Sequence, residues 1–179
     1  MIFHTNMKEI KQMFFNDTLR RWYFEDIIKE SKISRERVNY FLKQLLKEDL
    51  IKRIKPRDKR PYYLANRDSS KFRNEKRLYG LNLLNKSGLF EHLNDIKKIK
   101  TAIIFGSFSR GDWGKSSDID LFLYGDDNEF NQTEFEKKLK REIQIFKDLK
   151  RLDPKVIPNI VKGFYIKQSI EPFKVDINA

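Results

Sequence analysis

The sequence contains no cysteine, only two histidines and no long apolar run. The absence of cysteine excludes a disulfide framework, a thiolate zinc site and a thiol nucleophile. His4 and His92 are too few for a histidine metal cluster. No apolar stretch approaches the roughly 18 residues of a membrane span, and the first residues lack the apolar segment of a signal peptide. We therefore expect a cytoplasmic protein without a membrane-embedded part.

The composition favours a folded chain with a charged surface. Of the 179 residues, 39% are hydrophobic and 36% are charged. Fifteen Phe, seven Tyr and two Trp are too many aromatic residues for a disordered, solvating segment. The length suits one domain or two small ones.

The net charge of +12 is unevenly spread along the chain. Residues 1–67 hold 17 basic and 9 acidic side chains, whereas residues 99–179 hold 14 basic and 13 acidic ones. A basic part joined to a nearly neutral part favours one module that binds a polyanion and another with a different task. A solvated lysine surface is the alternative interpretation of the same pattern.

Residues 1–66 have the pattern of a winged helix-turn-helix domain. Apolar spacing predicts three helices and then a basic hairpin, over 8–15, 25–31, 34–47, 51–55 and 62–64. Ser34 stands where an N-cap of the third helix is expected. In that architecture the third helix enters the major groove of DNA, and the hairpin contacts phosphates.

The candidate DNA contacts are long basic or amide side chains on the polar face of the third helix and on the hairpin. They are Arg35, Asn39, Tyr40, Lys43, Arg53, Lys55, Arg57, Lys59 and Arg60. Such a cluster predicts binding to double-stranded DNA that weakens steeply with salt. A module that only dimerises or docks a protein is the alternative, so a homodimer is also compatible with the sequence.

Residues 67–98 are predicted to form a helical connector. A helix capped by Ser69 or Ser70 would run to about Asn85, with Phe72, Leu78, Leu81 and Leu84 facing inward. A second helix would cover 89–96 and carry His92 as a packed or solvated residue. The remaining segment, 99–179, is then a second domain.

One stretch of this second domain carries chemistry. A short apolar strand over 100–105 runs into Gly106-Ser107, and the pair Asp118 and Asp120 begins the next strand. Gly106 permits a tight turn, and the amides after Ser107 suit a phosphate. Arg110 would contact a phosphate or brace the loop through a carboxylate. Two carboxylates two residues apart on a strand share one side, where Mg²⁺ (or Mn²⁺) would relieve their repulsion.

A Gly-Ser turn followed by an Asp-x-Asp strand resembles the signature of the nucleotidyltransferase superfamily typified by DNA polymerase β. Arg110, Gly111 and Ser117 also match the minimal members of that family. The resemblance implies a mixed-sheet α/β domain that transfers a nucleoside monophosphate from a nucleoside triphosphate. In it, Asp118 and Asp120 hold the metal, and Gly106, Ser107 and Arg110 bind the phosphates.

The whole chain, of predicted class α+β, is similar to prokaryotic transcriptional regulators fused to a nucleotidyltransferase domain. This wider resemblance covers the predicted winged helix, the exit at 62–66, the connector and the motif. It implies a protein that binds both DNA and a nucleotide.

The third carboxylate of the catalytic family members is missing at its expected place. The segment 141–146 is predicted to be the strand that carries it, and Gln144 stands at that position. Glu142 lies on the same predicted face and is the candidate substitute, with Asp148 and Asp176 as more remote ones.

Three functions therefore remain open. The chain is an active nucleotidyltransferase that acts on a nucleic-acid or protein hydroxyl, a DNA-binding regulator whose transferase domain is degenerate or senses nucleotide, or an antitoxin that acts on a toxin partner. Trp113, after the turn, would either stack on a base or pack over the loop.

Overall fold

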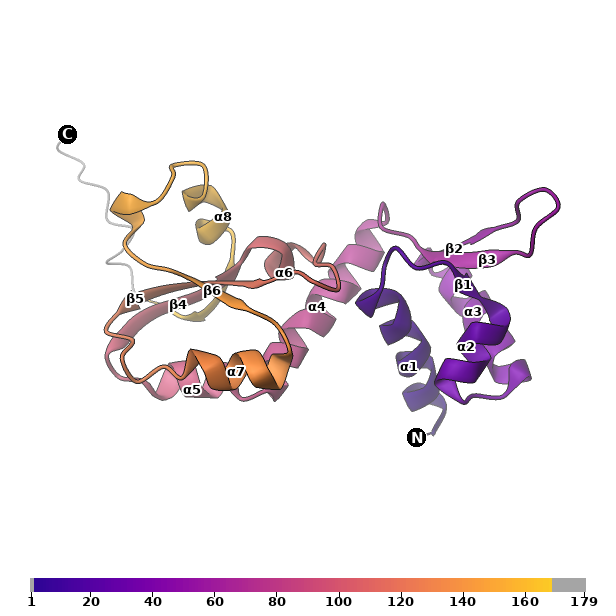
Figure 1. The fold of residues 1–179 in the computed structure, drawn as a ribbon, viewed down its shortest axis with the longest axis horizontal. Helices are drawn as coiled ribbons and strands as arrows, with labels where there is room; N and C mark the ends of the chain where they lie inside the picture. Colours follow the sequence, from indigo (N-terminus) through magenta and orange to yellow (C-terminus); the bar gives the residue numbers. More distant parts are fainter. Residues whose placement is uncertain (1, 169–179) are drawn as a thin grey trace. The chain divides into compact units, whose positions relative to one another are not determined.

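The computed structural model describes residues 2–168, with helices and two sheets that confirm the predicted α+β class (Figure 1). The chain divides into two compact units, residues 1–76 and 77–179. The boundary lies within α4 (Ser70–Lys86), inside the segment predicted to be a connector. Among the helices of residues 2–168, none has the length and apolar character that crossing a membrane requires.

The first unit begins with three helices and three short strands. In chain order they are α1 (Ile2–Asn16), β1 (Trp22–Tyr23), α2 (Phe24–Ser31), α3 (Arg35–Lys47), β2 (Ile51–Ile54) and β3 (Tyr62–Ala65). The strands form an antiparallel sheet in the order β1-β3-β2, with β3 in the centre.

Helix α3 forms because its apolar residues recur at helical spacing and face the core of this unit. Val38, Phe41, Leu42 and Leu45 are buried. Ser34 occupies the N-cap position as predicted, but its side chain makes no capping hydrogen bond and instead contacts the Glu36 carboxylate. Burial of the apolar face therefore accounts for the helix better than capping does.

Helix α4 corrects one detail of the sequence analysis. Phe72, Leu81 and Leu84 are buried as predicted, but Leu78 is 67% exposed. At 100° per residue, the buried arc runs from Phe72 through Leu84 to Leu81, and Leu78 lies about 60° beyond it. The prediction that Leu78 faces inward was wrong. Its three-residue spacing from Leu81 suits a shared face, but Leu78 lies beyond the edge of the arc that the buried residues of α4 define.

The second unit contains the larger sheet and the helices that cover it. Its elements after α4 are α5 (Leu89–Asp95), β4 (Ile99–Phe105), α6 (Gly106–Arg110), β5 (Ile119–Gly125), α7 (Gln132–Leu139), β6 (Ile143–Phe146), the 3₁₀ turn η1 (Leu149–Arg151), α8 (Ile157–Val161) and β7 (Phe164–Lys167). The strand order is β6-β5-β4-β7. Strands β5 and β6 are parallel and the other pairs are antiparallel, so the sheet is mixed.

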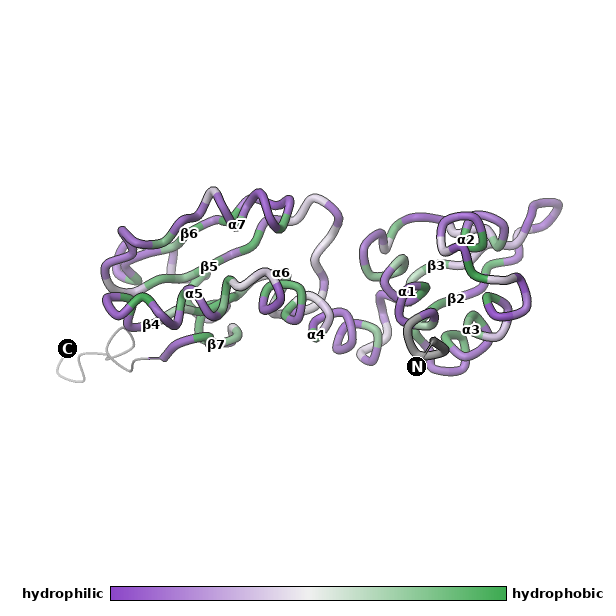
Figure 2. Tube along the Cα trace, turned by 90° about the horizontal axis from the view of Figure 1, so that it is seen from below, coloured by the Kyte–Doolittle hydropathy of each residue, from purple (hydrophilic) through white to green (hydrophobic). Residues whose placement is uncertain are grey.

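Helices cover both faces of this sheet. Helices α5 and α7 lie on one face, and α8 lies on the other (Figure 1). The central strand β5 is hydrophobic over most of its length, as Figure 2 shows, because it contributes to both cores. Ile119, Leu121 and Leu123 belong to the large core beneath α5 and α7, while Phe122 belongs to the small core beneath α8.

This alternation decides where Asp120 points. Because side chains on a strand alternate between faces, Asp120 lies on the same face as Phe122, the face with the small core. The same rule places Ile143 and Ile145 in the large core and Phe146 against the small one. Strand β7 ends at Lys167, and Asp176, one of the remote candidates for the third acid, lies outside the described residues.

Candidate active site

The turn between β4 and α6 is shaped to accept a carboxylate. Gly106 has a φ of +65°, a conformation that side chains other than glycine rarely adopt. A Cβ atom on Gly106 would overlap Oδ2 of Asp120 and would lie 2.8 Å from its Cγ. The glycine therefore leaves room for the carboxylate of the neighbouring strand.

Asp120 is held in this turn by backbone pairing and by a hydrogen bond. It pairs with Phe105 across β4 and β5, and its carboxylate accepts a hydrogen bond from the backbone N–H of Ser107. The Ser107 amide, at the start of the turn predicted to bind a phosphate, is thus used by Asp120.

The pKa of Asp120 lies above its ordinary value. Partial burial is the main cause, and the charge of Asp118 raises this pKa further. Arg110 and the Ser107 amide oppose the rise. The structure therefore brings the two predicted acidic residues together, at a place where their negative charges are only partly compensated.

Asp118 is exposed and directly precedes β5. The loop before it is fixed by Arg141, whose Nη1 donates to the carbonyl oxygens of Gly114 and Ser117 at 3.1 and 2.7 Å. Within the loop, the Ser117 hydroxyl accepts a hydrogen bond of 2.7 Å from the Gly114 N–H. Arg141 thus positions Asp118 through the backbone of the loop.

Arg141 itself is half-buried beside the aromatic residues of the loop. Its guanidinium carbon lies 5.2 Å from the ring centre of Trp113 and 5.4 Å from that of Phe108. Burial lowers the pKa of Arg141, while the charge of Asp118 raises it. The sequence analysis missed this residue.

The structure bears on two side chains, Arg110 and Trp113, for which the sequence left alternatives open. Arg110 Nε lies 3.1 Å from an Asp112 carboxylate oxygen, so the loop-bracing contact is formed. Trp113 is only 1% exposed and stacks on Phe108, with 5.1 Å between ring centres. Trp113 therefore packs beneath the loop, the second of the two alternatives.

Gln144, which stands where the resemblance predicts a third carboxylate, is the residue of β6 that pairs with Asp120 in the parallel register of β5 and β6. Glu142 is exposed one step before β6, and its carbonyl oxygen accepts a hydrogen bond of 2.9 Å from the Ile119 N–H. Glu142 therefore lies next to Asp118, and both line a hollow of about 400 Å³.

The donor atoms at this site fit a divalent cation held by two carboxylates. Within residues 2–168, no three acidic, histidine or cysteine side chains form a metal-binding group, so Glu142 does not complete one with Asp118 and Asp120. Carboxylate oxygens are the ligands that Mg²⁺ prefers, with substrate phosphates completing its coordination. A cation between Asp118 and Asp120 would relieve the repulsion that raises the pKa of Asp120.

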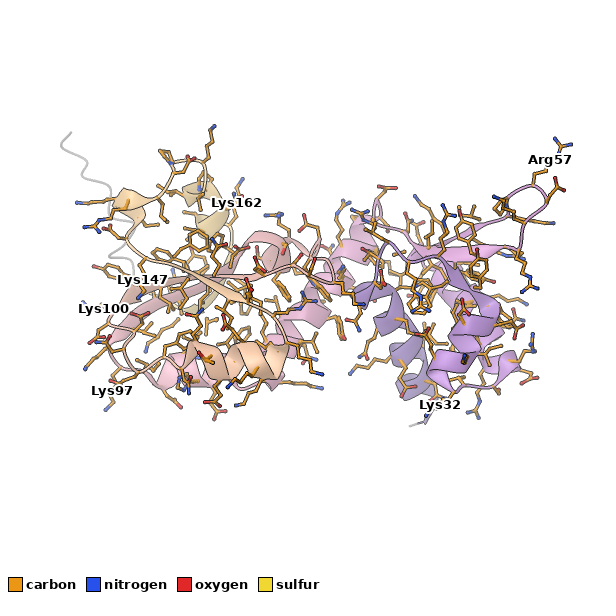
Figure 3. The ribbon with its side chains drawn as sticks, in the orientation of Figure 1. Lys32, Arg57, Lys97, Lys100, Lys147 and Lys162 are labelled. Carbon is orange, nitrogen blue, oxygen red and sulfur yellow. The ribbon has the colours of Figure 1, made fainter. Side chains whose placement is uncertain are left out.

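The candidate DNA contacts of the first unit are all exposed. They are Arg35, Asn39, Tyr40 and Lys43 on α3, and Arg53, Lys55, Arg57, Lys59 and Arg60 on the hairpin of β2 and β3. Arg57 projects from the tip of the hairpin (Figure 3). Arg35 is already engaged by both carboxylate oxygens of Glu25 at 2.8 Å, so it is less available than the hairpin residues.

Comparisons with known proteins agree with the geometry of the second unit. The family model described as "Nucleotidyltransferase domain" matches residues 86–177. No protein with curated annotation matches the chain at a significant level.

Two solved structures are similar to part of the chain. The first is a crystal structure of a mutant MntA–HpeT toxin–antitoxin, with 17% identity over 53% of this chain and 75% of the other, and a TM-score of 0.35. The second is a toxin–antitoxin with AMP-PNP, with 19% identity, coverage of 56% and 78%, and a TM-score of 0.35. At these TM-scores the likeness carries no argument about function.

The family match spans more than half of the chain and includes the turn at Gly106, both aspartates and the strand with Gln144. The chain therefore belongs to the family of nucleotidyltransferase domains.

Proposed function

We propose that the second unit is an Mg²⁺-dependent nucleotidyltransferase that moves a nucleoside monophosphate from a nucleoside triphosphate to a hydroxyl group. One observation carries this proposal. The Gly106 turn and the Ser107 amide hold the carboxylate of Asp120 beside Asp118, although burial and like charge oppose that arrangement. Two acidic side chains held together against burial and like charge are expected where a site binds a cation during its function.

The residues have distinct tasks in this proposal. Asp118 and Asp120 would hold the divalent ions that nucleotidyltransferase domains generally use. The Ser107 hydroxyl and the exposed guanidinium of Arg110 would orient the β- and γ-phosphates. The bound ions supply charge neutralisation at the triphosphate and lower the pKa of the acceptor hydroxyl. The hydroxyl oxygen bonds to the α-phosphorus, the bond to pyrophosphate breaks, and the hydroxyl proton passes to water.

We expect that Gln144, in place of a carboxylate, lowers the rate of nucleotide transfer more than it weakens the binding of nucleotide and metal. An amide oxygen is a weaker metal ligand than a carboxylate and a poor base. Glu142 lies close to Asp118 but completes no metal-binding group with the two aspartates within residues 2–168, so we propose no metal-ligand role for it.

A transfer assay tests this function. Wild-type protein is incubated with each nucleoside triphosphate labelled at the α-phosphate, with Mg²⁺ or Mn²⁺, and with nucleic-acid or protein acceptors. We expect label to appear on an acceptor for wild type and to be lost in Asp118→Asn, because one metal carboxylate is gone. Calorimetry with the same nucleotides reports binding separately, and no binding of any of them would contradict the proposal.

We also propose that the first unit is a winged helix that binds double-stranded DNA. The order of its helices and its three-stranded sheet support the architecture. The five hairpin cations Arg53, Lys55, Arg57, Lys59 and Arg60 are exposed, which supports phosphate contact. A chain that binds DNA without transferring nucleotide would be the regulator with a degenerate or nucleotide-sensing domain.

Replacement of Arg57, Lys59 and Arg60 by glutamine is expected to weaken duplex binding about equally for all sequences. Each lost phosphate contact should reduce the slope of log affinity against log salt by about 1. Fluorescence anisotropy over a salt series measures this slope. The control replaces Lys150, Lys155 and Lys162, which are exposed in the other unit and change the net charge by the same amount. Equal effects of both triple variants would contradict a hairpin contact.

The antitoxin function stays a prediction, because no contact of the described chain distinguishes a toxin partner from another protein acceptor. Its test is transfer of nucleotide to a co-expressed toxin, or a stable complex with one, that requires Asp118.

A further inference from the structure

We propose that Gly80, in the interior of helix α4, is a positioning residue for the pair Asp118 and Asp120. Gly80 touches neither substrate nor metal. It acts through Trp113, whose ring packs against the helix and supports the loop that leads to Asp118. The inference rests on the proposed transferase function and adds to it a residue that lies outside the Gly-Ser turn and the Asp-x-Asp strand.

The backbone of Gly80 gives no reason for a glycine at this position. Gly80 lies well inside α4, which runs from Ser70 to Lys86, and its conformation is helical. Every residue type can adopt that conformation. A glycine inside a helix also destabilises it relative to alanine, because glycine loses more backbone freedom on folding. The reason for Gly80 must therefore lie in what packs against it.

Two aromatic rings near the carboxylate pair lie directly against Gly80. A Cβ atom built on Gly80 would lie 2.8 Å from Nε1 of Trp113 and 3.2 Å from Cδ1 of Phe108. Phe108 belongs to α6, the helix that begins with the Gly106 turn, and α6 lies beside α4 in both views (Figures 1 and 2). Because 2.8 Å is closer than a Cβ atom can approach, a larger residue at position 80 must displace the indole of Trp113.

The indole is packed on its other sides as well. Trp113 is stacked on Phe108, with 6° between the ring planes. The guanidinium of Arg141 lies near its ring, and the ring centre of Tyr79, the neighbour of Gly80 in α4, lies 6.1 Å from its own. Since protein interiors are close-packed, this surrounding cannot absorb a shift of the indole without moving itself.

A displaced indole moves the loop that carries Asp118. Trp113 directly precedes Gly114, whose carbonyl oxygen accepts a hydrogen bond from Arg141 Nη1. The same Nη1 donates to the carbonyl oxygen of Ser117, the residue directly before Asp118. Each link in this path is a covalent neighbour or one hydrogen bond, so a shift at Trp113 changes the place of the Asp118 carboxylate. A metal ligand displaced by a fraction of an ångström loses much of its effect.

Gly80→Ala in the full chain tests this role, and Asn82→Ala is the matched control. Both changes increase the helix propensity of α4, but Asn82 is exposed. We expect Gly80→Ala to transfer nucleotide about tenfold more slowly than wild type, and Asn82→Ala to match wild type. The melting temperature of Gly80→Ala should stay close to that of wild type, because the gain in helix propensity opposes the cost of moving the indole.

Three further readouts separate positioning from a general loss of structure. The affinity for Mn²⁺, measured without nucleotide from the electron paramagnetic resonance of the free ion, should fall in Gly80→Ala. In a Trp113→Phe background, which removes the crowded Nε1, Gly80→Ala should change transfer by less than about twofold. In a Trp22→Phe background, Trp113 is the only tryptophan, and Gly80→Ala should shift its fluorescence emission without any metal.

The possible outcomes have distinct meanings. Equal transfer and equal Mn²⁺ affinity in Gly80→Ala and Asn82→Ala would overturn the role of Gly80. An equal loss from Gly80→Ala with Trp113 and with Trp113→Phe would overturn the path through the indole. If wild type transfers no nucleotide, the proposed function fails. Weaker Mn²⁺ binding by Gly80→Ala, restored by Trp113→Phe, would then still support the positioning of Asp118, whereas a wild type that binds no Mn²⁺ would overturn both.

Discussion

Gly106→Ala is expected to abolish most nucleotide transfer and to destabilise the second unit. The left-handed backbone conformation costs alanine roughly 1–2 kcal/mol on its own. The added methyl group must also displace the carboxylate of Asp120, because a Cβ atom at this position overlaps its Oδ2. A displacement of the metal ligand by about 1 Å would reduce the transfer rate about 100-fold.

Gly88→Ala is the matched control for this variant. Gly88 also has a positive φ, +84°, but nothing lies within 4 Å of a Cβ atom built on it. The two variants therefore share the backbone cost, and only Gly106→Ala disturbs Asp120. Thermal unfolding and the transfer assay should show a stability loss in both and a loss of transfer in one. Equal transfer by the two variants would contradict the role assigned to Gly106.

The features that the sequence predicted well are those with short-range causes. Helix α3 ends at Lys47 as predicted, and α1 ends at Asn16, one residue after its predicted end. The predicted start of α1 at residue 8 was wrong, because the helix begins at Ile2. The apolar runs before the Gly-Ser turn and around the Asp-x-Asp pair correctly predicted two strands, and these strands, β4 and β5, are neighbours in the sheet. Alternation along β6 predicted only that Gln144 shares a face with Glu142; its place beside Asp120 is set by the register of β6 with β5.

Arg141 could not be found in this way, because its partners are backbone carbonyls. Gly114 and Ser117 lie 27 and 24 residues before it, and any residue type would offer the same acceptors. The only sequence signal is an arginine at the start of a strand near an acidic loop, which is common on protein surfaces. Contacts of this kind depend on tertiary folding and leave no pattern in the local sequence.

The hydrogen bond from the Ser107 amide to the Asp120 carboxylate could not be predicted from the sequence either. The motif correctly brought Ser107 and Asp120 to one site, but it could not show that the carboxylate itself occupies the space beside the turn. That outcome depends on how closely β4 and β5 approach at Phe105, which is a property of the sheet.

Asp120→Asn is expected to remove transfer and, at the same time, to raise the melting temperature of the second unit. Burial and the charge of Asp118 raise the pKa of Asp120 above its ordinary value of 3.8, so the folded state disfavours the ionised carboxylate. Asparagine has nearly the same shape and can still accept the Ser107 hydrogen bond, but it carries no charge. The variant should therefore gain a few degrees at neutral pH.

The pH dependence of this gain has a definite sign. Below the unfolded pKa, both states of the wild-type protein hold a neutral Asp120, so the variant has no advantage. As pH rises through 3.8 towards the raised folded pKa, the unfolded state ionises first and wild-type stability falls. The difference in melting temperature should therefore grow from about pH 4 and stay constant above the folded pKa.

Asp126→Asn is the control, because the pKa of Asp126 is shifted in the opposite direction to that of Asp120. The pKa of Asp126 is lowered, chiefly by the Asn128 backbone N–H and then by Lys98, so neutralising it should not stabilise the protein. Mg²⁺ should raise the melting temperature of wild type towards that of Asp120→Asn and leave the variant unchanged, because a cation relieves the same repulsion. If Asp120→Asn melts below wild type at neutral pH without Mg²⁺, the carboxylate pair is not held against its own repulsion, and the electrostatic basis of the proposed site is wrong.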